Sequence, residues 1–280
     1  MTQPAFRPLP SRSRPLLWLL SVALALVVLA GCASQAPRVS STPTPGVEPM
    51  TASDEPQSVR RARLRYELAA NYFDQGQTTV ALDEIKLALA ADANFGPAYI
   101  LRGLVYMRLQ DDALAEESFR RALQINPRDA EAQHAYGLFA CEKARYEQAD
   151  RLFQQALESP TYKNRPRTLL LQGVCLLRAG KLPEAEAALA RAYEFDPGNP
   201  IAAYNLASLK HRRGDSQAAQ FIIRRVNNSE LANAETLWLG IRVERRLGND
   251  VVVAQLAQQL GRRFPESPQW AAYQRGAFND

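Results

Sequence analysis

The sequence predicts an all-α protein: a right-handed α-solenoid of about six helical-pair repeats, with about twelve helices and a C-terminal cap. Three observations carry this prediction. From about residue 58 onward, a pattern of small and apolar residues returns roughly every 34 residues. Turn-forming residues recur at fixed places between the apolar stretches. The 280 residues are 46% hydrophobic and 22% charged, so the chain can bury a core.

Small residues mark where the two helices of each pair should meet. A glycine allows the closest approach because it has no side chain to hold the helices apart. Alanines do the same from the partner helix. The glycines are Gly103, Gly137, Gly173 and Gly240, and the alanines are Ala115, Ala149, Ala185 and Ala219.

The repeats follow one another in order along the chain. The predicted ranges are 62–95, 96–129, 130–163, 166–199, 200–232 and 233–267, with a two-residue insertion at 164–165 and a weaker fifth repeat. Turns inside the pairs are predicted at Gln110-Asp111, Gly180-Lys181 and Gly214-Asp215. Asn126-Pro127 and Asp196-Pro197 should end second helices, because the residue before proline avoids the α region. Residues 268–278, with Trp270, Tyr273 and Phe278, are expected to cap the open end.

The residues before the repeats are organised differently. Arg7, Arg12 and Arg14 precede an uncharged apolar run that ends near Ala30, and Cys32 follows. This is the pattern of a secretory signal, and its end resembles the lipobox of bacterial lipoproteins. We expect a signal peptide over 1–31, lipidation of Cys32, a Pro-rich tether over 32–57 and the repeat domain over 58–280. The alternative is an uncleaved membrane anchor with an incidental cysteine.

Several classes of chemistry lack support in the sequence. Without the three arginines of the leader, the net charge falls from +5 to +2, which gives no reason to expect a nucleic-acid partner. The chain has three cysteines and two histidines, and no spacing typical of a metal site, a catalytic triad or a phosphate loop. We therefore expect no enzyme activity, no cofactor, no metal and no small-molecule substrate. His134 and His211 are interpreted as partly buried or surface residues.

The repeat pattern resembles the tetratricopeptide repeat, which is 34 residues long with small and aromatic residues at set places. That resemblance implies that defined positions of each first helix point into a concave groove. Here most of them are apolar in the N-terminal half. Either tight winding buries these side chains, or they form an apolar groove for a partner segment. The candidate groove residues are Tyr66, Phe73, Ile100, Leu104, Met107, His134, Leu138, Leu170 and Val174.

Cys141 and Cys175 are the two cysteines left once Cys32 is acylated. They lie in first helices of consecutive repeats, at nearly the same phase. A disulfide is possible in an oxidising compartment, if the Cβ vectors converge. The alternative is two separate buried thiols that act as small apolar groups.

The whole arrangement resembles one family, the type IV pilus biogenesis and stability lipoproteins (PilF/PilW), which are secretin pilotins. Local similarity lies in the stretch from His134 to Cys141, in the insertion Pro160-Thr161-Tyr162, and in the stretch from Leu237 to Arg242. The resemblance implies a lipid-anchored protein on the periplasmic face of the outer membrane. Its partner would be a secretin subunit, whose localisation and multimerisation it promotes. The alternative is a lipoprotein adaptor for peptidoglycan enzymes or for outer-membrane protein assembly.

Overall fold

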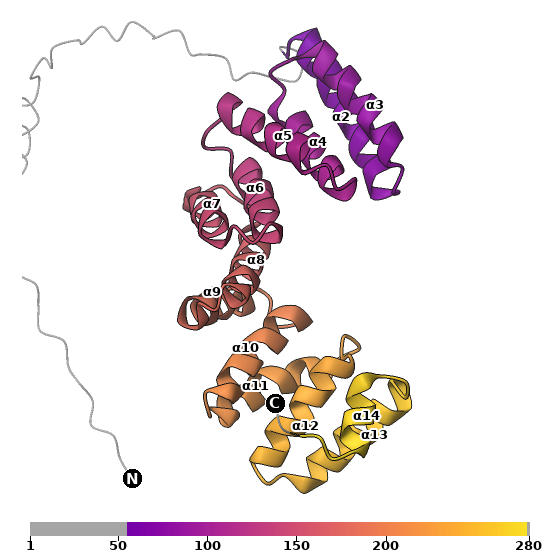
Figure 1. The fold of residues 1–280 in the computed structure, drawn as a ribbon, viewed down its shortest axis with the longest axis vertical. Coiled ribbons are helices and arrows are strands. Elements are labelled where there is room, and N and C mark those ends of the chain that lie inside the picture. Colours follow the sequence, from indigo (N-terminus) through magenta and orange to yellow (C-terminus); the bar gives the residue numbers. More distant parts are fainter. Residues whose placement is uncertain (1–54, 279–280) are drawn as a thin grey trace, which may run out of the picture. The chain divides into compact units, whose positions relative to one another are not determined.

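The computed structural model describes residues 55–278, all of which belong to one unit that spans residues 54–280. The predicted signal peptide, Cys32 and nearly all of the tether lie outside the described residues. Between residues 55 and 278 there are thirteen helices and no strand (Figure 1). They are α2 (Gln57–Asp74), α3 (Thr78–Ala91), α4 (Gly96–Arg108), α5 (Asp112–Ile125), α6 (Ala130–Glu142), α7 (Tyr146–Glu158), α8 (Arg165–Arg178), α9 (Leu182–Phe195), α10 (Pro200–Arg212), α11 (Ser216–Asn227), α12 (Ala234–Arg246), α13 (Asp250–Arg263) and α14 (Pro268–Gln274).

Twelve of these helices form six antiparallel pairs, which confirms the predicted solenoid. The first helices of the pairs are α2, α4, α6, α8, α10 and α12, and each packs mainly against the second helix that follows it. Each second helix then contacts the next first helix, and successive first helices also touch one another. The first helices therefore line one side of the whole array of pairs.

The turn inside each pair uses a left-handed backbone conformation. The residue in this conformation is Gly76, Gln110, Ala144, Gly180, Gly214 or Gly248, with φ between 56° and 94°. These positions are 34 residues apart, except for 36 residues between Ala144 and Gly180, where the insertion falls. Glycine adopts this region without a steric penalty, whereas Gln110 and Ala144 do so at a cost.

The predicted close approaches are present. A Cβ atom added to Gly173 would lie 2.6 Å from Cγ of Leu189 and 3.2 Å from its backbone nitrogen, so no side chain fits there. Gly103 and Gly137 face the rings of Phe119 and Phe153 in the same way. The partner alanines are fully buried at Ala115, Ala149, Ala185 and Ala219.

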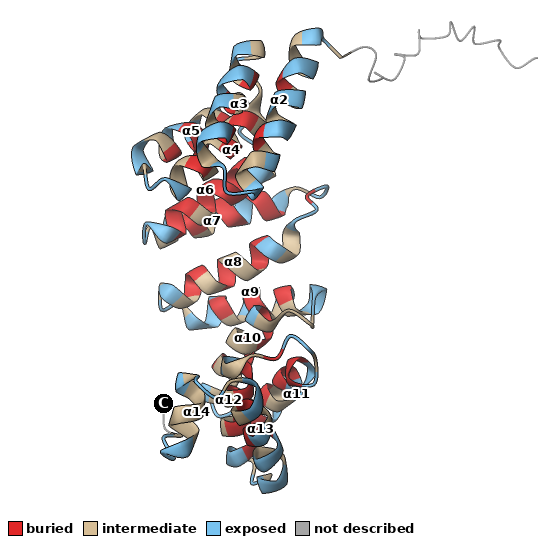
Figure 2. Cartoon of the chain, turned by 90° about the vertical axis from the view of Figure 1, so that its right-hand side faces the viewer, coloured by how far each residue is buried: buried red, intermediate tan, exposed pale blue. Residues whose placement is uncertain are grey.

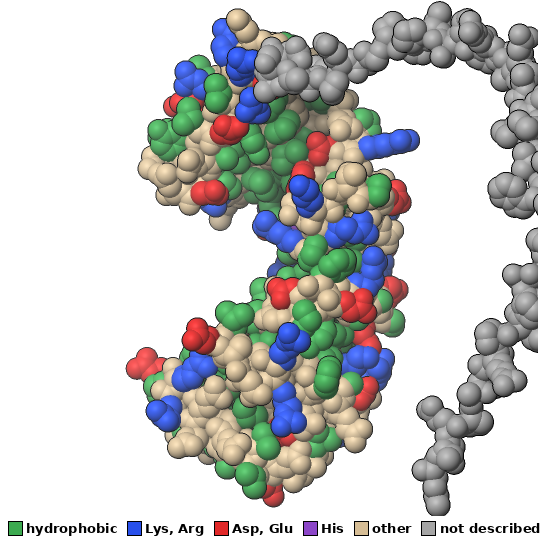
Figure 3. Space-filling view, turned by 180° about the vertical axis from the view of Figure 1, so that it is seen from behind, with side chains coloured by type: hydrophobic (Ala, Val, Ile, Leu, Met, Phe, Trp, Pro, Cys, Tyr) green, Lys and Arg blue, Asp and Glu red, His purple; other side chains and the backbone are tan. Residues whose placement is uncertain are grey.

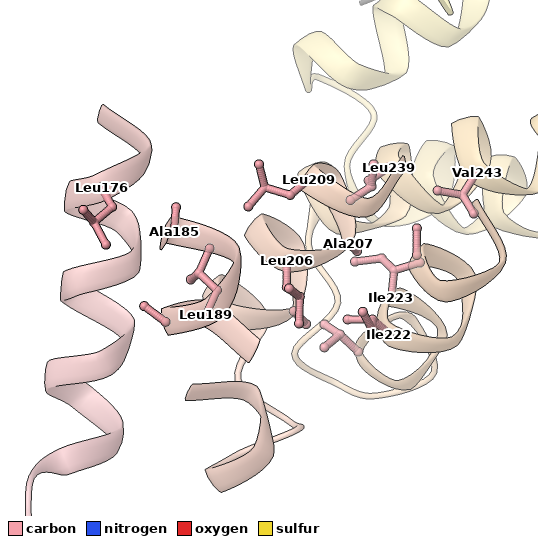
Figure 4. Close-up of a cluster of buried hydrophobic side chains, with 14 residues drawn as sticks. Leu176, Ala185, Leu189, Leu206, Ala207, Leu209, Ile222, Ile223, Leu239 and Val243 are labelled. Carbon is pink, nitrogen blue, oxygen red and sulfur yellow. The ribbon is translucent and has the colours of Figure 1, made fainter. Parts of the chain in front are cut away.

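Buried side chains lie on the helix faces that point toward neighbouring helices (Figure 2). One core cluster runs from α8 to α12 and includes Leu189, Leu206 and Ile223 (Figure 4). Because this cluster joins three successive pairs, the stability of one repeat depends on its neighbours.

The two ends of the solenoid are closed differently. Helix α2 begins five residues before the predicted repeat, and its outer side carries the exposed side chains Glu67 and Asn71. The residues 34 positions later, Leu101 and Val105, are buried against the preceding pair. At the other end, α14 provides the predicted aromatic cap, with the ring of Phe278 5.4 Å from that of Trp238.

Candidate protein-binding groove

The nine predicted groove residues lie on four successive first helices. Tyr66 and Phe73 are on α2, the next three on α4, His134 and Leu138 on α6, and the last two on α8. Eight of the nine are half-buried, and His134 is buried. The structure therefore falls between the two alternatives, because these side chains are neither fully enclosed nor fully exposed. We call this set the first-helix groove.

Six of the apolar groove residues pack on a core cluster and also keep an open side: Tyr66, Phe73, Ile100, Leu104, Met107 and Leu170. Tyr66 and Phe73 pack on the cluster around Leu101 of α4. Leu104 and Met107 pack on the next cluster, which contains Phe139. Hydrophobic side chains gather over the first helix pairs, beside a hollow in the surface (Figure 3). The groove thus presents apolar side chains that are held in place by their packing on the core.

The N-terminal part of the groove has an aromatic and cationic border. The ring of Tyr66 meets Phe95 edge-on at 5.8 Å. The Arg108 guanidinium lies 3.8 Å from the centre of the Phe73 ring and donates a hydrogen bond of 2.7 Å to the Phe73 carbonyl oxygen. Burial raises the pKa of Tyr66, and the carboxylates of Glu131 and Asp74 add to that rise, so its hydroxyl stays neutral.

His134 is held in a buried hydrogen-bonded cluster. Its Nδ1 lies 2.7 Å from Oγ1 of Thr168, which is 2.8 Å from the Tyr162 hydroxyl. The Thr168 hydroxyl donates its one proton to the Asn164 carbonyl oxygen, so it accepts from Tyr162 and from a protonated Nδ1 of His134. Burial lowers the pKa of His134 to about 4, with a smaller contribution from Arg167, which leaves the ring neutral. This cluster ties α6, α8 and the insertion together beneath the groove.

The repeat pattern predicts that His134 lies on the groove but does not reveal Tyr162 and Thr168 as its partners. Tyr162 is 7% exposed even though it lies in the loop between α7 and α8. In the sequence, Pro160-Thr161-Tyr162 indicates only the family resemblance, with no role assigned to Tyr162. An aromatic residue in a loop can indicate that the loop packs on the core, because a fully solvated loop gains nothing from a large apolar side chain.

Cys141 and Cys175 are joined by a disulfide in the structure. Their Cα atoms are 5.9 Å apart, and the bond links α6 to α8 across 34 residues of sequence. Both residues are buried, and Cys141 borders the groove. The bridge therefore fixes the spacing of two neighbouring first helices where the 34-residue register is interrupted.

A different part of the surface contains a charged cavity of about 680 Å³ between α4 and α5. Arg102 pairs with Glu117 at 3.0 Å and Arg120 pairs with Glu116 at 2.8 Å, so both carboxylates of the cavity are in ion pairs. The third arginine, Arg121, donates hydrogen bonds to the side chains of Gln124 and Asn94. Among residues 55–278, no group of three or more His, Cys, Asp or Glu side chains is arranged to hold a metal ion.

Glu116 is the centre of this charged network. Burial alone would raise its pKa, but hydrogen bonds from Arg145, Arg120 and the Tyr136 hydroxyl outweigh burial and lower the pKa to about 2. The Tyr136 hydroxyl donates at 2.8 Å and Arg145 at 3.0 Å. The carboxylate joins α5 to α6 on the side away from the first-helix groove, and we assign it a structural role.

Comparison with known proteins places the chain in a family. Models of the tetratricopeptide repeat match residues 96–129, 140–200 and 176–235. The type IV pilus assembly protein PilF of Pseudomonas aeruginosa is 26% identical over 208 residues, which is 74% of this chain and 82% of PilF. The crystal structure of PilW, described as a type IV pilus biogenesis factor, is 30% identical; the match covers 76% of this chain and 97% of PilW, with a TM-score of 0.66. The chain belongs to the PilF/PilW family.

The solved structure of Pseudomonas aeruginosa PilF supports the fold assignment of this PilF/PilW member. The match covers 78% of this chain and 99% of that one, with 24% identity and a TM-score of 0.72. The resemblance predicted from the sequence is thereby confirmed at the level of fold and family. Within the described part of this PilF/PilW protein, no helix has the length and apolar character needed to cross a bilayer.

Proposed function

We propose that the protein acts as a pilotin, binding secretin subunits and promoting their localisation and multimerisation in the outer membrane. Membership of the PilF/PilW family supports a role in type IV pilus biogenesis. In this proposal the first-helix groove is the binding surface, and an acylated Cys32 anchors the protein to the periplasmic face of the outer membrane. The protein binds without chemistry, and its partner is another protein.

The observation that carries the proposal is the half-buried state of the groove residues. Leu104 and Met107 expose apolar surface, yet core packing beneath holds each of them in place. A partner segment that covers this surface gains hydrophobic stabilisation without having to order the groove first. Four adjacent helices offer such side chains, which suits an extended or helical segment of a partner.

Tethering would strengthen a weak groove interaction. The tether of about 25 residues would reach roughly 75 Å from the bilayer as a continuous polyproline II helix, at about 3.1 Å per residue. Confining the groove to this layer raises its effective concentration toward a membrane-bound partner without adding a contact. The Cys32→Ser variant should therefore lose outer-membrane fractionation, and secretin multimerisation should fall with it.

The groove is tested by a matched pair of substitutions on α4. Leu104→Glu places a carboxylate in the groove, whereas Leu109→Glu makes the same change at an exposed residue at the end of the helix, 47% exposed. In cells, Leu104→Glu should reduce heat-resistant secretin multimers on a blot, and Leu109→Glu should leave them unchanged. Thermal melting of both variants separates binding from folding, because a buried charge can destabilise the repeat.

Two results would count against the proposal. Unchanged secretin multimers in a strain that lacks this protein would eliminate the pilotin function. An equal loss of stability and of secretin capture in Leu104→Glu would instead assign the groove residues to the core.

A further inference from the structure

The fifth and sixth helix pairs enclose a small cavity that is separate from the first-helix groove. It has a volume of about 160 Å³ and lies between α11, α12 and α13. Its apolar lining includes Ile223, Val252 and Leu256. Its rim carries the exposed side chains Arg224 and Gln255.

Two residues that line this cavity, Glu244 and Asn227, each carry a buried side-chain oxygen without a hydrogen-bond partner among the described residues. Glu244 is 1% exposed, and its Oε2 accepts hydrogen bonds of 2.6 Å from Gln220 and from Asn249. Its Oε1 accepts no hydrogen bond; the exposed Arg224 forms an ion pair with it, in which Nε lies 3.9 Å away, too far for a hydrogen bond. Asn227 is 3% exposed; its Nδ2 donates to the Thr236 carbonyl oxygen, while its Oδ1 is likewise unpartnered.

Gly240 leaves room for the side-chain amide of Asn227 in the wall of the cavity. Gly240 lines the cavity, and a Cβ there would collide with Nδ2 of Asn227 and lie 3.1 Å from Leu256. The site therefore combines a buried carboxylate oxygen, a buried amide oxygen and apolar walls. A buried carboxylate oxygen without a donor carries a large desolvation cost, which a cationic donor would remove.

We propose that this cavity binds a primary alkylammonium group carried on a short aliphatic stem. The ammonium supplies three donors and a positive charge, which match Glu244 Oε1 and Asn227 Oδ1. The stem lies along Val252 and Leu256. The volume equals that of about five water molecules, at about 30 Å³ each, which accommodates the end of a lysine side chain or a small free amine.

Titration of the full-length chain in detergent micelles tests the site. The protein is labelled with ¹⁵N-glycine, and the amide signal of Gly240 reports on the cavity. The probes are n-butylammonium and N-acetyl-lysine methylamide, with neutral n-butanol as the matched control. Saturable shifts in the millimolar range are expected for at least one ammonium probe, because ligands this small bind weakly. A response to both probes identifies a lysine side chain as an acceptable source, and a response to butylammonium alone identifies a free amine.

Variants show whether the carboxylate is responsible. Glu244→Gln keeps the shape of the side chain and its acceptor for Gln220 but removes the charge, and should weaken ammonium binding about tenfold or more. Glu235→Gln changes an exposed glutamate on the same helix and should have no effect. Val252→Phe fills the cavity and should abolish the shift, which provides a second test if Glu244→Gln does not fold. Equal shifts with butanol, or undiminished binding in Glu244→Gln, would overturn the proposal.

Discussion

Replacing Ala144 by glycine should stabilise the protein, although glycine usually destabilises. Ala144 is the left-handed residue of the turn between α6 and α7, with φ of 56°. The equivalent residue is glycine in four of the other five turns. A Cβ in this conformation crowds the following carbonyl oxygen, whereas glycine adopts it freely.

The magnitude follows from two opposing contributions. The left-handed conformation costs an alanine about 1–2 kcal/mol. Glycine loses about 0.5–1 kcal/mol more conformational entropy on folding. The net gain for Ala144→Gly is therefore about 0.5–1 kcal/mol. The side chain of Ala144 is exposed, so no core contact is lost.

The reverse change provides an internal check. A Cβ added to Gly214 would have no heavy atom within 4 Å, so Gly214→Ala introduces backbone strain without a collision. It should destabilise by about 1 kcal/mol. Ala187→Gly, at an exposed interior position of α9, should also destabilise by about 1 kcal/mol, because there glycine brings only its entropy cost.

Urea denaturation followed by circular dichroism at 222 nm measures all three variants against the parent protein. The expected order of midpoints is Ala144→Gly above the parent, with Gly214→Ala and Ala187→Gly below it. If Ala144→Gly lowers the midpoint as much as Ala187→Gly does, the left-handed conformation at this turn carries no strain and the reasoning is refuted.

Two further predictions concern α6 and α8. The folded-state pKa of His134 is about 4, below its ordinary value of 6.5, so the unfolded chain binds the proton more tightly. The stability that the neutral His134 contributes is therefore present above pH 6.5 and is lost as the pH falls toward 4. The loss amounts to at most about 3 kcal/mol. Denaturation of His134→Asn between pH 4 and pH 7 should lack this dependence, and an unchanged slope would contradict the assignment. Replacing Cys141 and Cys175 together by serine should cost about 4 kcal/mol by the chain-entropy estimate for a 34-residue loop. Thiol titration of the denatured, unreduced protein should find no free thiol at these positions, and two free thiols would rule out the bridge.

The helix pairs could be predicted from the sequence because their determinants are local and repeated. Gly103 and Gly173 marked the contact of two helices through the absence of a side chain, and the structure places Phe119 and Leu189 there. The first repeat has Ala93 where the second has Pro127, and α3 nevertheless ends at Ala91, so the missing proline does not alter the pattern. The requirement for a small residue at the helix contact recurs along the chain, and this repetition makes the helix pairs recognisable where a single small residue would not.

The depth of the groove could not be predicted in the same way. Burial of a first-helix position depends on the rotation between successive pairs and on loops that reach over them. His134 is buried because Tyr162, from the insertion, reaches Thr168 beside it. Leu138, on the same helix, stays half-buried. Neither the rotation nor the path of the loop is encoded in a 34-residue periodicity.

Glu244 was missed for a related reason. It is followed by two arginines, and such a stretch is typical of a solvated helix end. Its phase in the repeat carried the contrary signal, because the equivalent residue of the fourth pair is Leu176, which is buried. The equivalent residues of the second and third pairs, Tyr106 and Ala140, are also uncharged, whereas that of the fifth pair is Lys210. The charged residues at this position in the last two pairs therefore indicate a local exception to the apolar packing.

The disulfide also has a mechanical consequence when the folded chain is pulled from its two ends. When tension is applied between the termini, the force path runs from Cys141 directly to Cys175 through the sulfur atoms. The intervening segment, including all of α7, carries no load and cannot be drawn out. At about 3.4 Å per extended residue, the 34 residues remove roughly 115 Å from the maximum extension. Even when all helix pairs are unfolded by force, the segment between Cys141 and Cys175 would therefore remain a closed loop. Reduction of the disulfide would allow that segment to extend.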